Sequence, residues 1–223
     1  MSVDTSQAVP SGLLSATAPL VRVVDDEVAI QALFERIGQL CGFAVDCHST
    51  AESFLNAYDD LRPGCLVIDL MLPDRSGIEV LQEVTNRGCE LPVVFMSGMA
   101  RVSEAVQALK LGSIDFVEKP FDVQQIAEVL RRAVDLDLNR RRQGADQDDL
   151  RRRFQSLTRR ETQVMEQIVR GAANKEVAAS LGLSHKTVEV HRANVMRKTQ
   201  ARSLAELVRL HVAANQSEQP QPA

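Results

Sequence analysis

The sequence predicts a doubly wound α/β domain built on a five-stranded parallel sheet, followed by a smaller all-helical domain. From residue 20 to 138, short runs rich in β-branched residues alternate with stretches that have helical spacing. This alternation is typical of a parallel sheet covered by helices on both faces. After about residue 157, a glycine separates a short helical stretch from a longer one, which is the pattern of a helix-turn-helix.

Length and composition agree with two folded domains. The chain has 223 residues, of which 44% are hydrophobic and 25% charged, as in globular proteins. Residues 1–19 are rich in Ser, Thr, Ala and Pro, and we expect this segment and the tail at 216–223 to be disordered. No stretch approaches the roughly 20 apolar residues of a membrane span, so we expect a cytoplasmic protein that does not engage a membrane.

The predicted strands and helices of the first domain follow in strict alternation. The apolar runs are "LVRVVD", "FAVDC", "CLVIDL", "PVVFMS" and "IDFVEK". Helical spacing is found near residues 27–40, 50–60, 76–87, 101–111 and 122–138. Ligands of such sheets bind at the carboxyl ends of the strands.

Charged and polar residues gather at that predicted edge. Asp25 and Asp26 end the first run, Asp69 ends the third, Ser97 ends the fourth and Lys119 follows the fifth. Three nearby carboxylates repel one another, and a hard divalent cation with oxygen ligands, Mg²⁺ above all, relieves that repulsion. A carboxylate nucleophile, a metal, a lysine and a hydroxyl are the parts that phosphoryl transfer needs.

With these five positions, residues 20–138 resemble the receiver domain of two-component response regulators, which has a flavodoxin-like fold. The resemblance implies that Asp69 takes a phosphoryl group from a cognate sensor histidine kinase. It also implies that Asp25, Asp26 and Asp69, with the backbone carbonyl of Met71, hold Mg²⁺.

The resemblance further implies a switch. Ser97 would donate a hydrogen bond to the phosphoryl group, Lys119 would hold its oxygens, and Phe116 would then turn inward. The surface formed by residues 101–138 would become the signalling face.

The formal charge of −4 hides a strong asymmetry. Residues 20–139 hold 10 basic and 20 acidic residues, a net charge of −10, whereas residues 150–215 hold 13 basic and 5 acidic residues, a net charge of +8. We therefore expect a polyanionic partner for the second part only. Between them, residues 139–156 form a charged linker that we expect can be helical on either side of Gly144.

The second domain, residues 157–215, begins with a capping-box pattern at Thr158 and Glu161. We expect Asn174 to cap a short helix that Gly182 ends, and Ser184 to cap a longer helix through about residue 198. A last amphipathic helix is expected near residues 203–214. At 100° per residue, one face of the longer helix carries small apolar, amide and charged groups, a mixture that suits the DNA major groove. This face comprises Lys186, Thr187, Glu189, Val190, Ala193, Asn194 and Arg197.

Residues 155–210, and "TVEVHRANVMRK" within them, resemble the LuxR-type helix-turn-helix of FixJ/NarL response regulators, a four-helix domain. The resemblance implies that Glu189, Val190 and Ala193 approach base edges. We assign Lys186, Thr187, Asn194 and Arg197 to phosphate contacts.

The chain is therefore interpreted as a phosphorylation-controlled transcription factor rather than a metabolic enzyme. Its expected partners are a sensor histidine kinase, double-stranded promoter DNA and, after phosphorylation, a second copy; RNA polymerase is a further candidate. Two alternatives stay open: a phosphorelay intermediate whose second domain binds protein, and a thiol redox regulator. The four cysteines form no CxxC pair and are expected to be reduced thiols in or near the core: Cys41, Cys47, Cys65 and Cys89.

Overall fold

The computed structural model describes residues 18–59, 61–98 and 102–216. The segments predicted to be disordered, 1–19 and 216–223, lie almost wholly outside these residues. The chain divides into two compact units, one ending at Arg141 and the other beginning at Arg142. Within the described ranges, no helix is long and apolar enough to cross a membrane.

The first unit is built on a five-stranded parallel sheet in the order β2-β1-β3-β4-β5. This order confirms the predicted doubly wound fold. The strands are β1 (Leu20–Val24), β2 (Ala44–His48), β3 (Gly64–Asp69), β4 (Val93–Ser97) and β5 (Asp115–Glu118).

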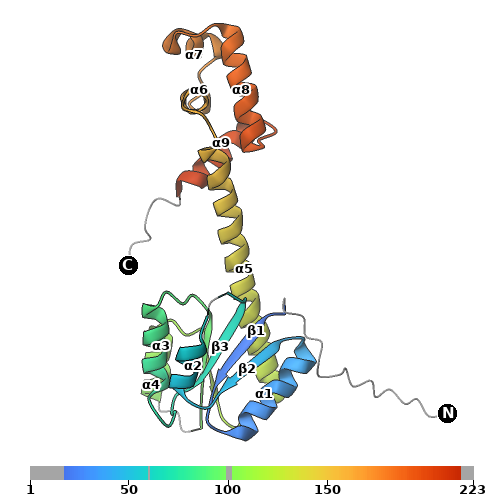
Figure 1. Cartoon of the computed structure of the whole chain (residues 1–223), viewed down its shortest axis with the longest axis vertical. Helices are drawn as coiled ribbons and strands as arrows, with labels where there is room; N and C mark the ends of the chain where they lie inside the picture. Colours follow the sequence, from blue (N-terminus) through green and yellow to red (C-terminus); the bar gives the residue numbers. More distant parts are fainter. Residues whose placement is uncertain (1–17, 60, 99–101, 217–223) are drawn as a thin grey trace, which may run out of the picture. The chain divides into compact units, whose positions relative to one another are not determined.

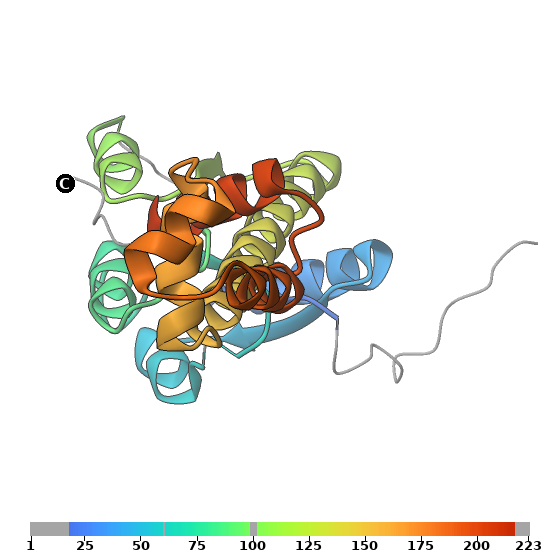
Figure 2. The same cartoon turned by 90° about the horizontal axis from the view of Figure 1, so that it is seen from above.

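Helices cover both faces of the sheet, and the two faces have separate cores (Figure 1 and Figure 2). Side chains of α1 and the first half of α5 pack on one face, and those of α2, α3 and α4 pack on the other. The helices are α1 (Val28–Cys41), α2 (Ala51–Ala57), α3 (Gly77–Asn86), α4 (Val102–Lys110) and α5 (Val123–Gln155).

Strand β3 runs through the middle of the sheet, and all of its residues are buried. Its first residue must be glycine, because a Cβ at Gly64 would lie 1.9 Å from the carbonyl oxygen of Leu20. The amide of Gly64 donates a 2.9 Å hydrogen bond to the buried carboxylate of Asp137 on α5. This bond fixes the start of the strand that ends at Asp69.

Helix α5 is longer than the sequence indicates. We predicted a helix to residue 138 and a linker that could be helical on either side of Gly144, whereas the structure has one helix through Gln155. Nothing lies near Gly144 that would require it to be glycine. Ion pairs one turn apart, Asp137 with Arg141 and Asp149 with Arg153, support the helix on both sides of it.

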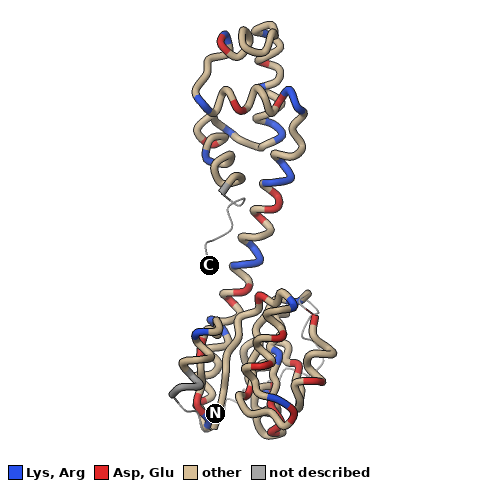
Figure 3. Tube along the Cα trace, turned by 90° about the vertical axis from the view of Figure 1, so that its left-hand side faces the viewer, with Lys and Arg blue, Asp and Glu red and all other residues tan. Residues whose placement is uncertain are grey.

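The second unit contains the end of α5 and four shorter helices around one apolar core, and Lys and Arg residues are spread along them (Figure 3). The short helices are α6 (Arg159–Val169), α7 (Asn174–Leu181), α8 (His185–Thr199) and α9 (Leu204–Gln216).

Candidate functional sites: an acidic pocket and a helix-turn-helix

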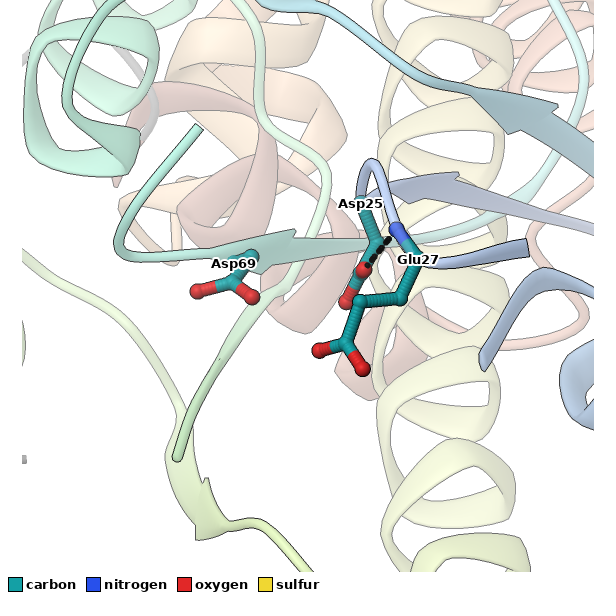
Figure 4. Close-up of side chains that lie close together, drawn as sticks. All are labelled: Asp25, Glu27 and Asp69. Atoms are coloured by element: carbon teal, nitrogen blue, oxygen red, sulfur yellow. Dashed lines mark hydrogen bonds between the residues drawn. The ribbon is translucent and has the colours of Figure 1, made fainter. Parts of the chain in front are cut away.

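Three carboxylates converge at the carboxyl edge of the sheet (Figure 4). Asp25 directly follows β1, Asp69 is the last residue of β3, and Glu27 lies in the loop before α1. Asp25 and Asp69 are 0% and 6% exposed, whereas Glu27 is exposed. One oxygen from each of the three lies within 4.8 Å of the others.

Lys119, which follows β5, supplies the positive charge of this pocket. Its Nζ donates to Asp25 Oδ2 and Asp69 Oδ2, at 2.6 Å each, and to Glu27 Oε1 at 2.8 Å. Burial alone would lower the pKa of Lys119, but these three hydrogen bonds raise it above its usual value. The lysine therefore stays charged, and all three of its ammonium protons are directed at carboxylates.

Among the described residues, the pocket is short of positive charge, since one ammonium faces three carboxylates. Burial raises the pKa of Asp25, although the bonds from Lys119 and from the amide of Glu27 oppose that rise. A set of clustered carboxylate oxygens, without nitrogen or sulfur donors, suits a hard divalent cation. The residues present therefore fit a metal of the Mg²⁺ type.

Each oxygen of the Asp69 carboxylate is oriented by a separate donor. The backbone amide of Met71 donates to Oδ1 at 2.9 Å, and Lys119 donates to Oδ2. Gly77 lies directly on the main chain of Asp69, because a Cβ there would be 2.3 Å from the Asp69 carbonyl oxygen. Asp69 is thus held on both its side chain and its main chain.

The other predicted pocket residues lie on the expected elements. Ser97 is buried at the end of β4, and Phe116 is half-buried on β5, packed against the core that α2, α3 and α4 cover. The side chain of Met71 is exposed. Asp26 is exposed as well, and among the described residues the acidic cluster contains Glu27 and not Asp26.

Two residues that contribute to the pocket were not predicted from the sequence. Glu27 directly follows the predicted acid pair, so its position next to Asp25 and Asp26 was a usable signal. Gln31 of α1 donates from Nε2 to the carbonyl oxygen of Asp25 at 2.6 Å and to Ser49 Oγ at 3.0 Å. Nothing in the sequence around Gln31 indicates this role, because its partners come from other segments.

The helix-turn-helix of the second unit consists of α7 and α8, joined at Gly182, which has a left-handed φ of 64°. Ser184 caps α8 as predicted, accepting the amide of Thr187 at 3.0 Å. The prediction for α7 was wrong by one residue, since the helix begins at Asn174 and its N-cap is Ala173. The carboxylate of Glu176 accepts the Ala173 amide at 2.7 Å, and the Glu176 amide donates to the Ala173 carbonyl at 2.9 Å, so Ala173 and not Asn174 closes the start of the helix.

The predicted outward face of α8 is open to solvent. Val188 and Val195 are buried, as the helical periodicity indicates, whereas Val190 is 54% exposed on the other side. The outward residues are exposed at Lys186, Glu189, Val190, Ala193 and Arg197, and half-buried at Thr187 and Asn194.

Lys198, in the last turn of α8, faces inward instead. Its Nζ donates to Glu161 Oε2 at 2.7 Å and to the carbonyl oxygen of Ser156 at 3.0 Å. Glu161 also accepts the amide of Thr158, in the predicted capping box of α6. Burial would raise the pKa of Glu161, but these bonds hold it below its usual value.

Two of the four cysteines are poorly suited to thiol chemistry. None of the four forms a disulfide, and burial raises the pKa of Cys47 to about 11 and that of Cys65 to about 12. A thiolate is the reactive form of cysteine, so neither residue is reactive near neutral pH.

Comparison with known families matches both units. Residues 21–131 match the response regulator receiver domain, and residues 155–211 match the LuxR family of bacterial regulatory proteins. The first match contains the acidic pocket, and the second contains the helix-turn-helix.

Relatives resemble the chain over most of its length. It is 42% identical to the transcriptional regulatory protein FixJ of Rhizobium meliloti, over 86% of this chain and 95% of that protein. It is 34% identical to the response regulator protein TodT of Pseudomonas putida, over 88% of this chain and 87% of that protein. The solved structure of the response regulator StyR matches with a TM-score of 0.81 and 37% identity, over 87% of this chain and 98% of that one. The chain therefore belongs to the FixJ-like response regulators, transcriptional regulators in which a receiver domain precedes a LuxR-type DNA-binding domain.

Proposed function

We propose that Asp69 accepts a phosphoryl group from the phosphohistidine of a sensor kinase, and that this acyl phosphate controls DNA binding. A carboxylate oxygen of Asp69 forms a bond to phosphorus, the P–N bond of the donor breaks, and the histidine nitrogen keeps the electron pair. The observation that carries the proposal is the carboxylate of Asp69, almost fully buried yet held by Lys119 and the Met71 amide.

Asp25, Asp26 and Asp69, with the backbone carbonyl of Met71, would hold Mg²⁺, which when bound neutralises charge on the phosphoryl oxygens. Lys119 already donates to the Asp69 carboxylate and would pair with the phosphoryl oxygens after transfer. This proposal extends the observed acidic cluster by Asp26, whose exposed side chain must turn toward the pocket.

Ser97 and Phe116 would report the modification. Ser97 ends the strand next to β3, so its hydroxyl is suited to donate to a phosphoryl oxygen on Asp69. Phe116 lies on β5, the strand next to β4, and its side chain has no hydroxyl. Its inward turn would therefore change the face formed by residues 101–138 through packing alone. We propose that this face then pairs two copies of the chain.

In the second unit, the outward face of α8 would enter the major groove. Glu189, Val190 and Ala193 would approach base edges, Ala193 through apolar contact only. Lys186, Thr187, Asn194 and Arg197 would contact phosphates, which fix the position of a protein on the duplex without reading its sequence. Paired copies would place two such helices on an inverted repeat.

We further propose a receiver at residues 20–138, a linker at 139–156 and a DNA-binding domain at 157–215, acting in the cytoplasm, with RNA polymerase as a candidate partner at the promoter. A phosphorelay intermediate that binds protein is the alternative. It predicts no specific DNA binding, whereas a domain of charge +8 that contacts phosphates must lose affinity steeply as salt rises.

The test is Asp69→Asn, which keeps the size of the side chain and removes the nucleophile. The variant should lose all magnesium-dependent labelling by acetyl phosphate and all phosphorylation-dependent gain in DNA affinity, with the same circular dichroism spectrum as the wild type. Undiminished labelling of another residue would disprove the assignment.

A further inference from the structure

The loop between β3 and α3 is attached to a helix that does not follow it in the chain. Asp74 lies in this loop, and its two carboxylate oxygens accept the amides of Ala51 and Glu52, at 3.0 and 2.9 Å. These amides belong to the first turn of α2 and have no partner within the helix. A third donor of that turn, the amide of Ser53, is accepted by Thr50, the N-cap residue of α2. Two different segments therefore cap one helix.

The same loop controls the carboxylate of Asp69. The Gly77 amide donates to the Leu70 carbonyl at 2.9 Å, and Met71 pairs with Ser76, so the base of the loop is closed. Met71, at this base, supplies the amide that orients Asp69 Oδ1. Because Gly77 also lies against the Asp69 main chain, a shift of the loop would move the donor and the carboxylate with respect to each other.

The end of the loop nearer α3 is fixed to α3 itself. Ser76 and Glu79 form a capping box there, and Arg75 pairs with Glu83 at 2.7 Å. Helix α2 offers a second fixed point, because Arg87 donates to the carbonyl of Leu55 near its other end at 2.8 Å. Asp74 is thus the side chain through which the tip of the loop holds on to α2.

We propose that Asp74 is a positioning residue of the phosphoryl-acceptor pocket. By binding the first turn of α2 it fixes the loop, and the loop places Met71, whose amide orients Asp69 and whose carbonyl would face Mg²⁺. This inference rests on the proposed function of Asp69. It adds to the pocket a supporting residue, Asp74, whose carboxylate binds the amides of α2 and not the acidic cluster.

The simpler alternative is that Asp74 only stabilises α2 as a helix cap. The chain offers a matched control, because Thr50→Ala removes a cap from the same helix without touching the loop. The loss of either cap should lower the melting temperature of the chain by a similar amount. A second control, Glu52→Gln, neutralises a carboxylate at the same helix end and so measures the effect of charge alone.

The experiment uses the full chain with Mg²⁺ alone, titrated by calorimetry, and then with acetyl phosphate at limiting and saturating Mg²⁺. Outer-shell partners of metal ligands typically alter metal affinity 10- to 100-fold, and Asp74 acts one step further out. We expect Asp74→Ala to weaken Mg²⁺ binding about tenfold and slow phosphorylation most at limiting Mg²⁺. Asp74→Asn, which keeps one acceptor oxygen, should show a smaller loss and covers the case in which the alanine variant unfolds. Thr50→Ala and Glu52→Gln should stay within about twofold of the wild type.

The outcomes separate this inference from the proposed function. If both Asp74 variants lose thermal stability as Thr50→Ala does but bind Mg²⁺ and accept phosphate like the wild type, Asp74 is only a cap, and the function of Asp69 stands. If Glu52→Gln weakens Mg²⁺ binding as much as Asp74→Ala, charge is the cause and positioning is refuted. A wild-type chain that is not labelled at Asp69 would overturn both proposals.

Discussion

Lys198 provides a test of how a basic residue on α8, the helix proposed to enter the major groove, is used. By charge and sequence position it resembles Arg197, its neighbour, and either could be assigned to DNA phosphates. The structure separates them, because Lys198 contacts the buried Glu161 and the carbonyl of Ser156, whereas Arg197 is exposed and its nearest polar partner is Asn194 at 3.3 Å. Lys198→Met should therefore affect stability, and Arg197→Met should affect DNA binding.

The expected cost of Lys198→Met follows from the burial of the pair. Removing one partner of a buried ion pair typically costs about 3–5 kcal/mol, since the other charge is left uncompensated. The side chain of Glu161 is 5% exposed and that of Lys198 24%, so water partly replaces the lysine and we expect about 2–3 kcal/mol. For a unit of this size, each kcal/mol shifts the melting temperature by about 4–8 °C, so we expect it to fall by about 8–24 °C.

Two measurements separate a role in stability from a role in DNA binding. The first is thermal unfolding, monitored by circular dichroism, and the second is DNA binding at several salt concentrations. Arg197→Met should unfold within about 0.5 kcal/mol of the wild type, but the slope of log affinity against log salt should fall by about 1. Lys198→Met, measured well below its melting temperature, should keep the wild-type slope. The reasoning is refuted if Lys198→Met is as stable as the wild type or loses the same slope as Arg197→Met.

Three further predictions follow from single residues. Glu161→Gln should destabilise the second unit by about 1–3 kcal/mol at pH 7. Because the pKa of Glu161 lies below its usual 4.5 in the folded state, the difference in unfolding free energy between wild type and variant should be full above about pH 4.5 and should shrink as pH falls through the folded pKa. Denaturation at pH 7 and at pH 3 would show this change. Gly77→Ala should abolish phosphorylation by acetyl phosphate and cost at least about 1–3 kcal/mol, because its Cβ meets the Asp69 carbonyl; an active, stable variant would contradict the packing described. Gly144→Ala should stabilise α5 by about 0.5–1 kcal/mol, because the site is helical with open space around it; a loss of helical signal by circular dichroism would count against a continuous helix.

The sheet and the acidic pocket could be predicted because their signals are local and repeat. Each strand is a short apolar run, and parallel strands bring their carboxyl ends to one edge whatever the loops do. Asp25, Asp69 and Lys119 therefore meet for reasons of topology, and the hydrogen bonds of Lys119 to both acids agree with that prediction. The buried and exposed sides of α8 follow from helical periodicity in the same way.

Other contacts depend on partner residues that no local sequence pattern indicates. The contacts of Asp74 and Lys198 join segments more than 20 residues apart, and only the folded chain brings those segments together. The misplaced cap of α7 has a different origin. Asparagine has a strong preference for the N-cap position, but the Glu176 carboxylate accepts the amide of Ala173 from within the helix. A local hydrogen bond of this kind overrides the preference of a single residue.

Helix α5 shows why the sequence does not reveal one continuous helix across the predicted linker. Its first half contributes Ile126, Leu130 and Ala133 to the receiver core, and its last turn packs Phe154 against the core of the second unit. Residues 139–153 contribute to neither core, and their charges and glycine resemble a linker for that reason. An isolated helical segment of about 15 residues is marginal in water, so the middle of α5 must draw its stability from the two packed ends of the helix and from its ion pairs. A segment stabilised in this way is the part of the helix most easily unfolded, and Gly144 lies within it.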